Sequence, residues 1–183
     1  MLTSLDDKLW FPDPDKAPVR GARAGLVAFG GDLSVDRLLL AYGSGIFPWT
    51  ENPITWWSPD PRGILCLDQV HVSRSLVRFL KKHPYQITVN RAFVEVMQGC
   101  TGPRKHETGT WITDGFLEAY CAMHRAGHAH SVECWHGEEL VGGIYGVAVG
   151  GLFAGESMFH RADNASKARP LVADKRNVGK VQE

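Results

Sequence analysis

The chain of 183 residues is long enough for one domain of ordinary size, and its 44% hydrophobic content is enough to form a core. Its 20 basic residues balance its 20 acidic residues, so net charge indicates no partner and any nucleic-acid contact must come from a local patch. No segment approaches the ~20 apolar residues of a membrane span, and the N-terminal "MLTSLDDKLWFPDPDKAP" lacks the apolar run of a signal peptide. We therefore expect a soluble, cytoplasmic protein.

The N-terminal third combines irregular chain with one helix. Residues 1–33 are rich in Pro, Gly and Asp and are expected to be irregular. Ser34 has the character of an N-cap, and the apolar residues after it predict a helix that Gly43 or Gly45 ends. Residues 45–63 hold four prolines and three tryptophans, which argues against a regular helix or a central strand.

The middle of the chain is expected to alternate strands and helices. The runs "GILCL" at 63–67 and "YQITV" at 85–89 predict two short strands, the first of them buried. Three helices are expected to begin after the N-caps Ser73, Asn90 and Thr113. Their expected ends are residue 82, about Gln98 and residue 125, and the last has an apolar spacing at Leu117, Tyr120, Cys121 and His124.

Short runs of Val, Ile, Tyr and Phe follow, separated by turn residues. They predict three strands at 129–135, 140–150 and 152–159, joined by links short enough for hairpins. An antiparallel meander flanked by helices gives an α+β fold class. Ser166 resembles the cap of a further helix, which Pro170 interrupts.

Two groups of residues could supply metal ligands, and we expect neither to bind a metal ion. The four cysteines form no CxxC pair and are expected to be reduced: Cys66, Cys100, Cys121 and Cys134. The second group straddles a helix end and a strand start, so its side chains need not converge: His124, His128, His130, Glu133 and Cys134.

Tryptophans in the loops have two interpretations. Trp49, Trp56, Trp57 and Trp111 either fill gaps in the core or form a platform on which a base stacks. Trp49 follows a proline, and Trp111 lies two residues before a helix N-cap, so these two are better placed for a ligand.

Charged residues supply two further candidates. A basic stripe on the helix over 74–82 is either a solvated face or a phosphate contact surface: Arg74, Arg78, Lys81 and Lys82. Glu156, on a strand among small and apolar residues, is either held by a structural hydrogen bond or faces an apolar pocket to meet an amine or guanidinium.

Seven motifs in order carry a family resemblance. They are "GGDLSVDRLLLAYGSGIFPW", "ITWWSPDPRG", "HVSRSL", "GTWIT", "AYCAMHRAGHAHSVECW", "LVGGIYGVAVG" and "FAGESMFHRADNASK". Together they resemble the bacterial leucyl/phenylalanyl-tRNA–protein transferases, from about Phe11 to Lys167. The resemblance implies transfer of leucine or phenylalanine, and less well methionine, from aminoacyl-tRNA to an N-terminal Arg or Lys of proteins in the N-end rule pathway. It implies no cofactor.

The resemblance also implies an architecture and a site. A small N-terminal α+β domain over 1–62 would join a domain like that of the Gcn5-related acetyltransferases over 63–167. Stacking and neighbouring residues for the terminal adenosine would be Trp49, Trp111, Tyr42 and Tyr120. Walls of the amino-acid pocket would be Ile144, Phe153, Gly155 and Met158, and Glu156 would be the acidic residue of the site. The stripe with Arg74 and Arg78 would follow the acceptor stem.

After Lys167 the sequence departs from the family pattern. The family continues with a helix and a strand bearing an Asp and a Gln, whereas residues 168–183 match neither and read as a frameshifted, disordered tail. The acetyltransferase-like domain would then be incomplete and the strand over 152–159 would have an unpaired edge, so we expect an impaired transferase that is poorly soluble or binds tRNA weakly. A non-catalytic protein that binds the tRNA 3′ end, and an acyltransferase that uses acyl-CoA, remain alternatives.

Overall fold

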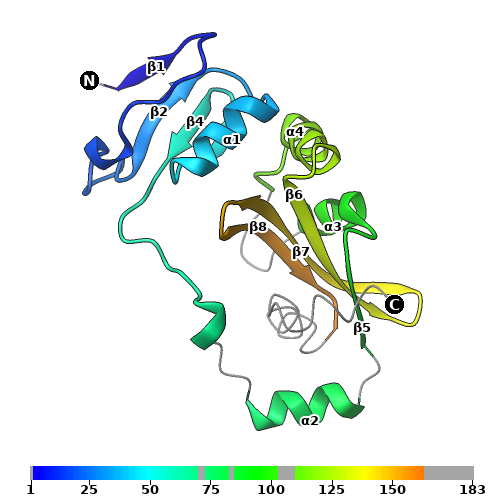
Figure 1. Cartoon of the computed structure of the whole chain (residues 1–183). Helices are drawn as coiled ribbons and strands as arrows, with labels where there is room; N and C mark the ends of the chain where they lie inside the picture. The colour runs from blue at the N-terminus through cyan, green and yellow to red at the C-terminus, as the bar shows by residue number, and fades with distance from the viewer. Residues whose placement is uncertain (1, 70–72, 83–84, 103–109, 163–183) are drawn as a thin grey trace. The chain divides into compact units, whose positions relative to one another are not determined.

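Two four-stranded sheets and four α-helices organise the part of the chain that the computed structural model describes, residues 2–69, 73–82, 85–102 and 110–162 (Figure 1). This arrangement confirms the α+β class. The chain forms two units, the first made of Met1–Gly63, Thr108–Ala129 and Val147–Ala154, and the second of Ile64–Glu107, His130–Gly146 and Gly155–Glu183. The expected helix at Ser166 and the tail from Ala168 lie outside the described residues.

The sheet of the first unit has the strand order β1-β2-β4-β3. Its strands are β1 (Thr3–Leu5), β2 (Leu26–Gly30), β3 (Phe47–Glu51) and β4 (Ile54–Trp57), and only the β1–β2 pair is parallel. The prediction that 45–63 holds no central strand was wrong, because β4 lies between β2 and β3. β4 contains no proline, and Pro48 lies in the edge strand β3, where a missing N–H is tolerated.

Trp56 fixes β4 in the core of the first unit. Its side chain is fully buried, and its indole N–H donates to the carbonyl of Gly30 on β2 at 2.9 Å. The ring of Phe11 meets the Trp56 ring edge-on with centroids 4.8 Å apart. A buried tryptophan with its polar atom satisfied stabilises the sheet and has no free face for a ligand.

The first helix, α1 (Val35–Gly43), forms as expected. The hydroxyl oxygen of Ser34 accepts a hydrogen bond from the backbone N–H of Arg37, which confirms the N-cap. The chain leaves the helix through Gly45, whose φ of +72° favours a residue without a side chain. The buried face of α1 consists of Arg37, Leu38, Ala41 and Tyr42.

Arg37 is a buried cation that an acidic residue and a backbone carbonyl stabilise. Its side chain is 1% exposed, and it donates through Nε to Asp32 at 3.0 Å and through Nη2 to the carbonyl of Asp6 at 2.9 Å. Partial burial raises the pKa of Asp32, but hydrogen bonds from Ser34 and from the Arg37 guanidinium outweigh it, so the pKa lies below its ordinary 3.8. The charged form of Asp32 therefore stabilises the folded chain.

Replacing Asp32 with Asn is expected to lower the free energy of unfolding at pH 7 by about 1–2 kcal/mol, because the Arg37 charge loses its counter-ion. The loss is limited because the Asp32 side chain is half exposed and water screens the ion pair. A carboxyl group whose pKa is depressed by folding stabilises the folded state at pH values above its unfolded pKa. The deficit should therefore be complete above pH 3.8 and shrink as the pH falls further. Urea unfolding across pH measures it. Asp7→Asn, at an exposed position, is the control with the same charge change.

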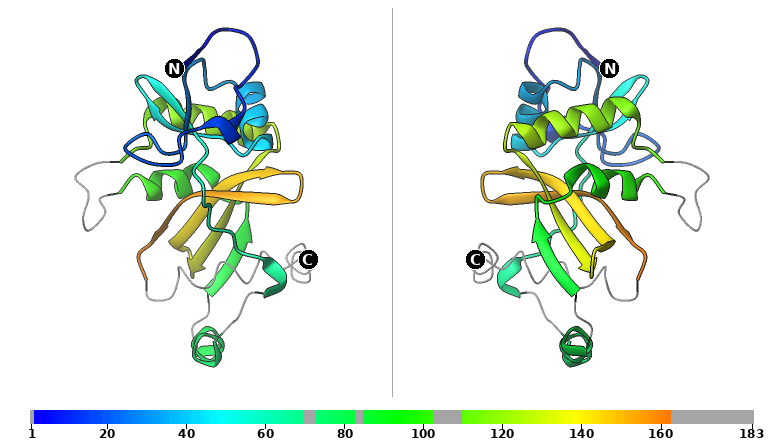
Figure 2. Two further views of the ribbon diagram at one scale, coloured as in Figure 1. Left: turned by 90° about the vertical axis from the view of Figure 1, so that its left-hand side faces the viewer. Right: turned by 90° about the vertical axis from the view of Figure 1, so that its right-hand side faces the viewer.

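The second sheet is the expected meander. It has the order β5-β6-β7-β8, with β5 (Tyr85–Val89), β6 (Ala129–His136), β7 (Glu139–Val149) and β8 (Leu152–His160). β5 pairs antiparallel with β6, and turns join the strands that follow (Figure 1, Figure 2). Gly137 and Gly150, in these turns, have positive φ. All four strands confirm the prediction within two residues.

The predicted buried strand at 63–67 was wrong. Ile64 and Leu65 are 76% and 64% exposed, and no strand among the described residues pairs with them. A short 3₁₀ helix, η2 (Leu67–Gln69), follows this run. Another, η1 (Pro14–Lys16), lies near the N-terminus. An apolar run predicts a strand only where a neighbouring strand supplies hydrogen bonds, and short sequence patterns do not reveal that neighbour.

Asn90 is not the cap of the following helix, α3 (Phe93–Cys100). It has a φ of +59°, and its side-chain oxygen accepts from the N–H of Ser131 on β6 at 3.1 Å. The N–H of Ala92, at the start of α3, instead donates to the buried carboxylate of Glu133 at 3.4 Å, which the hydroxyls of Thr88 and Ser131 also contact. The acceptor comes from a distant strand, so the local pattern pointed to the wrong residue.

The remaining helices begin and end where expected. They are α2 (Arg74–Lys82) and α4 (Asp114–Arg125), and Thr113 caps α4 by accepting from the N–H of Phe116. The buried face of α4 consists of Phe116, Ala119, Tyr120 and Met123 rather than the expected stripe through Leu117, Cys121 and His124. Both stripes satisfy helical spacing, and tertiary packing selects between them. Partial burial raises the pKa of the Cys121 thiol.

Candidate functional site

Trp49 lies at an irregularity in the edge strand β3. Pro48 pairs with Trp56 and Thr50 with Thr55, so Trp49 is an extra residue on β3 without an opposite partner on β4. Such bulges redirect a side chain and are common beside functional sites. The Trp49 side chain is 52% exposed, unlike the buried Trp56.

Two neighbouring rings contact Trp49. The centroid of its ring lies 5.6 Å from that of Trp57 in an edge-on arrangement and 6.0 Å from that of Phe47. The Trp57 indole N–H donates to the hydroxyl of Thr55 at 2.9 Å, which fixes the supporting ring. The guanidinium of Arg62 lies 4.9 Å from the centroid of Phe47. The cluster holds one exposed indole in place, as a stacking surface requires.

A second series of aromatic residues runs along α4. Trp111 meets Phe116 edge-on with centroids 5.4 Å apart, and Phe116 stacks on Tyr120 at 6.2 Å. The hydroxyls of Tyr120 and Tyr42 lie 2.6 Å apart, which joins α4 to α1 in the first unit. Phe116 is not among the residues predicted for the site, although its spacing of four residues from Tyr120 on a helix indicates the contact.

Replacing either tyrosine of this pair with Phe is expected to cost about 1 kcal/mol of unfolding free energy, because both rings are buried and the remaining hydroxyl loses a partner. The double variant should cost less than the sum of the single variants. Urea unfolding of Tyr42→Phe, Tyr120→Phe and the double variant measures the coupling. Additive single effects would contradict a direct hydrogen bond.

The predicted pocket walls lie on β7 and β8. Ile144 and Gly155 are in contact: a Cβ built on Gly155 would lie 3.2 Å from the Ile144 side chain, so a larger residue at 155 would crowd it. Met158 and Phe153 are 53% and 42% exposed, and Glu156 is half-buried. Ile144, Gly155, Glu156 and Met158 belong to the second unit, whereas Phe153 belongs to the first.

The basic stripe lies on α2. Arg74, Arg78 and Lys82 are exposed, and the guanidinium of Arg78 donates to the carbonyl of Arg74 at 3.4 Å. The side chain of Lys81 lies outside the described part of the structure. The exposed positions leave the cationic groups accessible to phosphates.

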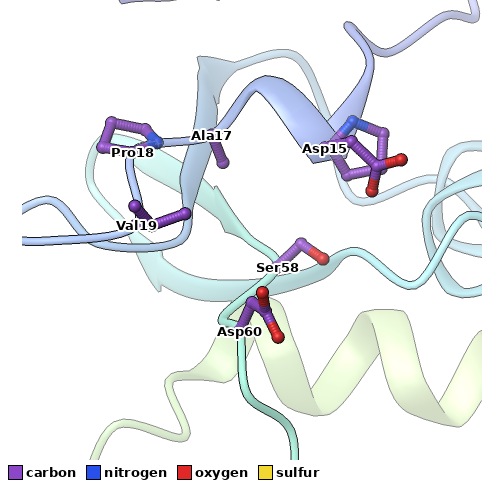
Figure 3. A pocket seen from close by; sticks show the side chains of 7 residues that line it. Asp15, Ala17, Pro18, Val19, Ser58 and Asp60 are labelled. Atoms are coloured by element: carbon purple, nitrogen blue, oxygen red, sulfur yellow. The ribbon is translucent and has the colours of Figure 1, made fainter.

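A pocket of about 260 Å³ lies elsewhere in the first unit (Figure 3). It is lined by Pro14, Asp15, Ala17, Pro18, Val19, Ser58 and Asp60. None of the sequence-predicted site residues is among them, so the pocket contributes nothing to the site deduced from the motifs.

The histidine group is distributed over separate contacts. His124 Nδ1 lies 2.8 Å from the carbonyl of Ala129, and His130 Nδ1 lies 3.0 Å from the side-chain nitrogen of Asn90. Across the described ranges no three His, Cys, Asp or Glu side chains are grouped to hold a metal ion. In the same ranges no helix combines the length and apolar character needed to traverse a bilayer.

Comparison with known proteins gives two family matches. The model of the leucyl/phenylalanyl-tRNA protein transferase N-terminal domain matches residues 31–60, and that of leucyl/phenylalanyl-tRNA protein transferase matches 64–176. A leucyl/phenylalanyl-tRNA–protein transferase of Pseudoalteromonas atlantica is 56% identical over 168 residues, which is 91% of this chain and 71% of that protein. The protein of the same name from Shewanella baltica strain OS185 is 54% identical over 160 residues, or 86% and 67% of the two chains.

These matches define an aminoacyltransferase with a mixed α+β fold. The chain belongs to the leucyl/phenylalanyl-tRNA–protein transferase family.

Proposed function

We propose that this chain transfers leucine or phenylalanine, and less well methionine, from aminoacyl-tRNA to proteins that begin with Arg or Lys. Such transfer marks proteins for the N-end rule pathway in the cytoplasm. Family membership supports this function. The structural observation that carries it is Trp49, an indole at a β-bulge that meets the Trp57 ring edge-on and is 52% exposed.

Trp49 and Trp111 would hold the terminal adenosine of the tRNA. An aromatic ring can stack any base, because every base has a π-face. Trp111 contacts Phe116 of α4 edge-on, and the hydrogen-bonded Tyr42 and Tyr120 stabilise that helix against α1. Each of the two tryptophans therefore contacts a neighbouring ring that can hold its indole in a fixed position. A fixed indole orients the ligand that stacks on it.

The amino-acid side chain would contact the apolar residues of β7 and β8. Ile144, Gly155 and Met158 of the second unit supply an apolar surface, on which the Ile144 side chain packs against Gly155. Leucine and phenylalanine gain from leaving water for such a surface. Polar or charged amino acids would lose hydration without compensation, which explains a preference for apolar ones.

The reaction requires handling of one proton. The α-amine of the acceptor protein attacks the ester carbon, a C–N bond forms, the C–O bond to the terminal ribose breaks, and the nitrogen passes a proton toward the leaving oxygen. Glu156 is half-buried on β8, and we assign it the role of holding or accepting that proton. A carboxylate also favours acceptors that begin with Arg or Lys, through charge-assisted hydrogen bonds.

Transfer of labelled phenylalanine from Phe-tRNA to a peptide that begins with Arg tests the function directly. We expect label on this peptide and none on the same peptide beginning with Ala, because the preference rests on the basic side chain. Binding of tRNA without transfer would contradict transferase function and favour a protein that only binds the tRNA 3′ end. Binding of acyl-CoA in a calorimetric titration would instead favour the acyl-CoA alternative.

Trp49→Ala and Trp111→Ala are each expected to weaken binding of an amide-linked phenylalanyl-adenosine analogue about 5- to 150-fold, the equivalent of about 1–3 kcal/mol for one base stacked on one ring. Fluorescence or calorimetric titration measures the affinity. Trp10→Ala is the matched control. Trp10 is likewise exposed in the first unit, at 38%, but its indole N–H donates a hydrogen bond to the Asp6 carboxylate. Equal losses in all three variants would refute the stacking role.

Arg74→Ala combined with Arg78→Ala is expected to weaken tRNA binding and to reduce the magnitude of the slope of log affinity against log salt by about 1–2. Each phosphate contact that is lost reduces the number of counter-ions released on binding. The control pair is Arg20→Ala with Arg23→Ala, two exposed positions of the first unit with the same change in charge. An unchanged slope in the α2 variant would show that the stripe is a solvated face. Titrations at several salt concentrations supply the slopes.

A further inference from the structure

The end of β3 and the start of α4 approach each other very closely in the first unit. A Cβ built on Gly115 would lie 1.9 Å from Oε1 of Glu51 and 2.7 Å from its carboxyl carbon. Both distances are far below any real carbon contact. Gly115 does not have a positive φ, so a side chain at this position is opposed by space rather than by backbone conformation, and the Glu51 carboxylate or the helix would have to move to admit it.

The two sides of this contact carry the two proposed stacking residues. Trp49 precedes Glu51 by two residues in β3, and Trp111 precedes Gly115 by four residues at the entry to α4. Trp111 contacts Phe116, the residue directly after Gly115. A shift of either element at the Glu51–Gly115 contact would therefore move one indole relative to the other.

β3 is held at its end within its own hairpin, where the Thr50 hydroxyl donates to the carbonyl of Pro53 and lies 2.7 Å from the hydroxyl of Thr55, and Glu51 adds a contact to α4. It is the edge strand of its sheet and pairs with β4 alone, and the bulge at Trp49 interrupts that pairing. The pairing resumes at Thr50 and Glu51, so the Glu51 side chain extends from the last paired residue toward α4. The half-buried carboxylate also lies at the N-terminal turn of α4, where the helix dipole favours negative charge.

We infer that the Glu51–Gly115 contact sets the spacing between Trp49 and Trp111, the two residues that form the adenosine platform. Glu51 and Gly115 position this platform without touching the ligand. This inference rests on the proposed function. Misplacement by about 1 Å can cost orders of magnitude in a positioned reaction. The absence of a side chain at 115 is then a condition for the correct spacing, not only for folding.

Four variants test the inference: Gly115→Ala, Glu51→Ala, the double variant, and Glu51→Gln. Gly115→Ala is expected to weaken binding of the phenylalanyl-adenosine analogue about tenfold, since the new methyl group displaces the carboxylate or the helix. Glu51→Gln, which keeps the shape, should bind nearly as the unmodified chain. The double variant should bind no worse than Glu51→Ala, because the methyl group occupies the space that the carboxylate leaves.

A purely structural role predicts a different pattern, so unfolding free energies are measured for every variant. Loss of affinity that exceeds the fraction unfolded supports positioning. Wild-type affinity in Gly115→Ala, or additive losses in the double variant, would overturn the inference. If Gly115→Ala does not fold, Glu51→Ala decides: unchanged affinity overturns positioning, and weakened affinity with Glu51→Gln near wild type supports it.

Fluorine NMR of the chain labelled with fluorotryptophan separates this inference from the proposed function, since it needs no ligand. Gly115→Ala, or Glu51→Ala where the former does not fold, should shift the resonances of Trp49 and Trp111, assigned through Trp→Phe variants, and leave that of Trp10 in place. Failure of the unmodified chain to bind the analogue would contradict the proposed function alone. Unmoved Trp49 and Trp111 resonances would overturn the positional role of the contact.

Discussion

The antiparallel pairing of β3 with β4 is the interaction on which the candidate adenosine platform depends. It places Trp56 in the core, where the carbonyl of Gly30 and the ring of Phe11 hold it, and Trp57 next to it beside Trp49. Side chains on a strand alternate between faces, so adjacent tryptophans take different roles. One stabilises the sheet, and the other supports an exposed indole.

Buried polar groups connect distant parts of each unit. In the first, Asp32 and the carbonyl of Asp6 stabilise Arg37, and the hydroxyls of Tyr42 and Tyr120 join α1 to α4. In the second, the Glu133 carboxylate accepts from two hydroxyls and from the start of α3. Each of these groups would cost free energy if it were buried alone, so each fixes the elements that satisfy it.

Sequence reasoning was accurate where the determining contacts are local. Ser34 and Thr113 cap their helices through backbone groups three residues away. The chain leaves those helices through Gly45 and Gly127, which have positive φ. It was wrong where the partner is distant. Asn90 bonds to β6 instead of capping α3, and the apolar run from Ile64 is exposed. Local patterns describe a residue's neighbours in the chain, not those in space.

The sequence by itself determined the family, the order of the meander strands and the starts of α1, α2 and α4, because motifs, periodicity and caps depend on residues close together in the chain. Only the tertiary structure decided which tryptophan is buried, which stripe of α4 packs inward, and that Gly115 lies against the Glu51 carboxylate. Each of these depends on a segment distant in sequence, such as Glu51 beside Gly115, and burial and close approach exist only once those segments pack.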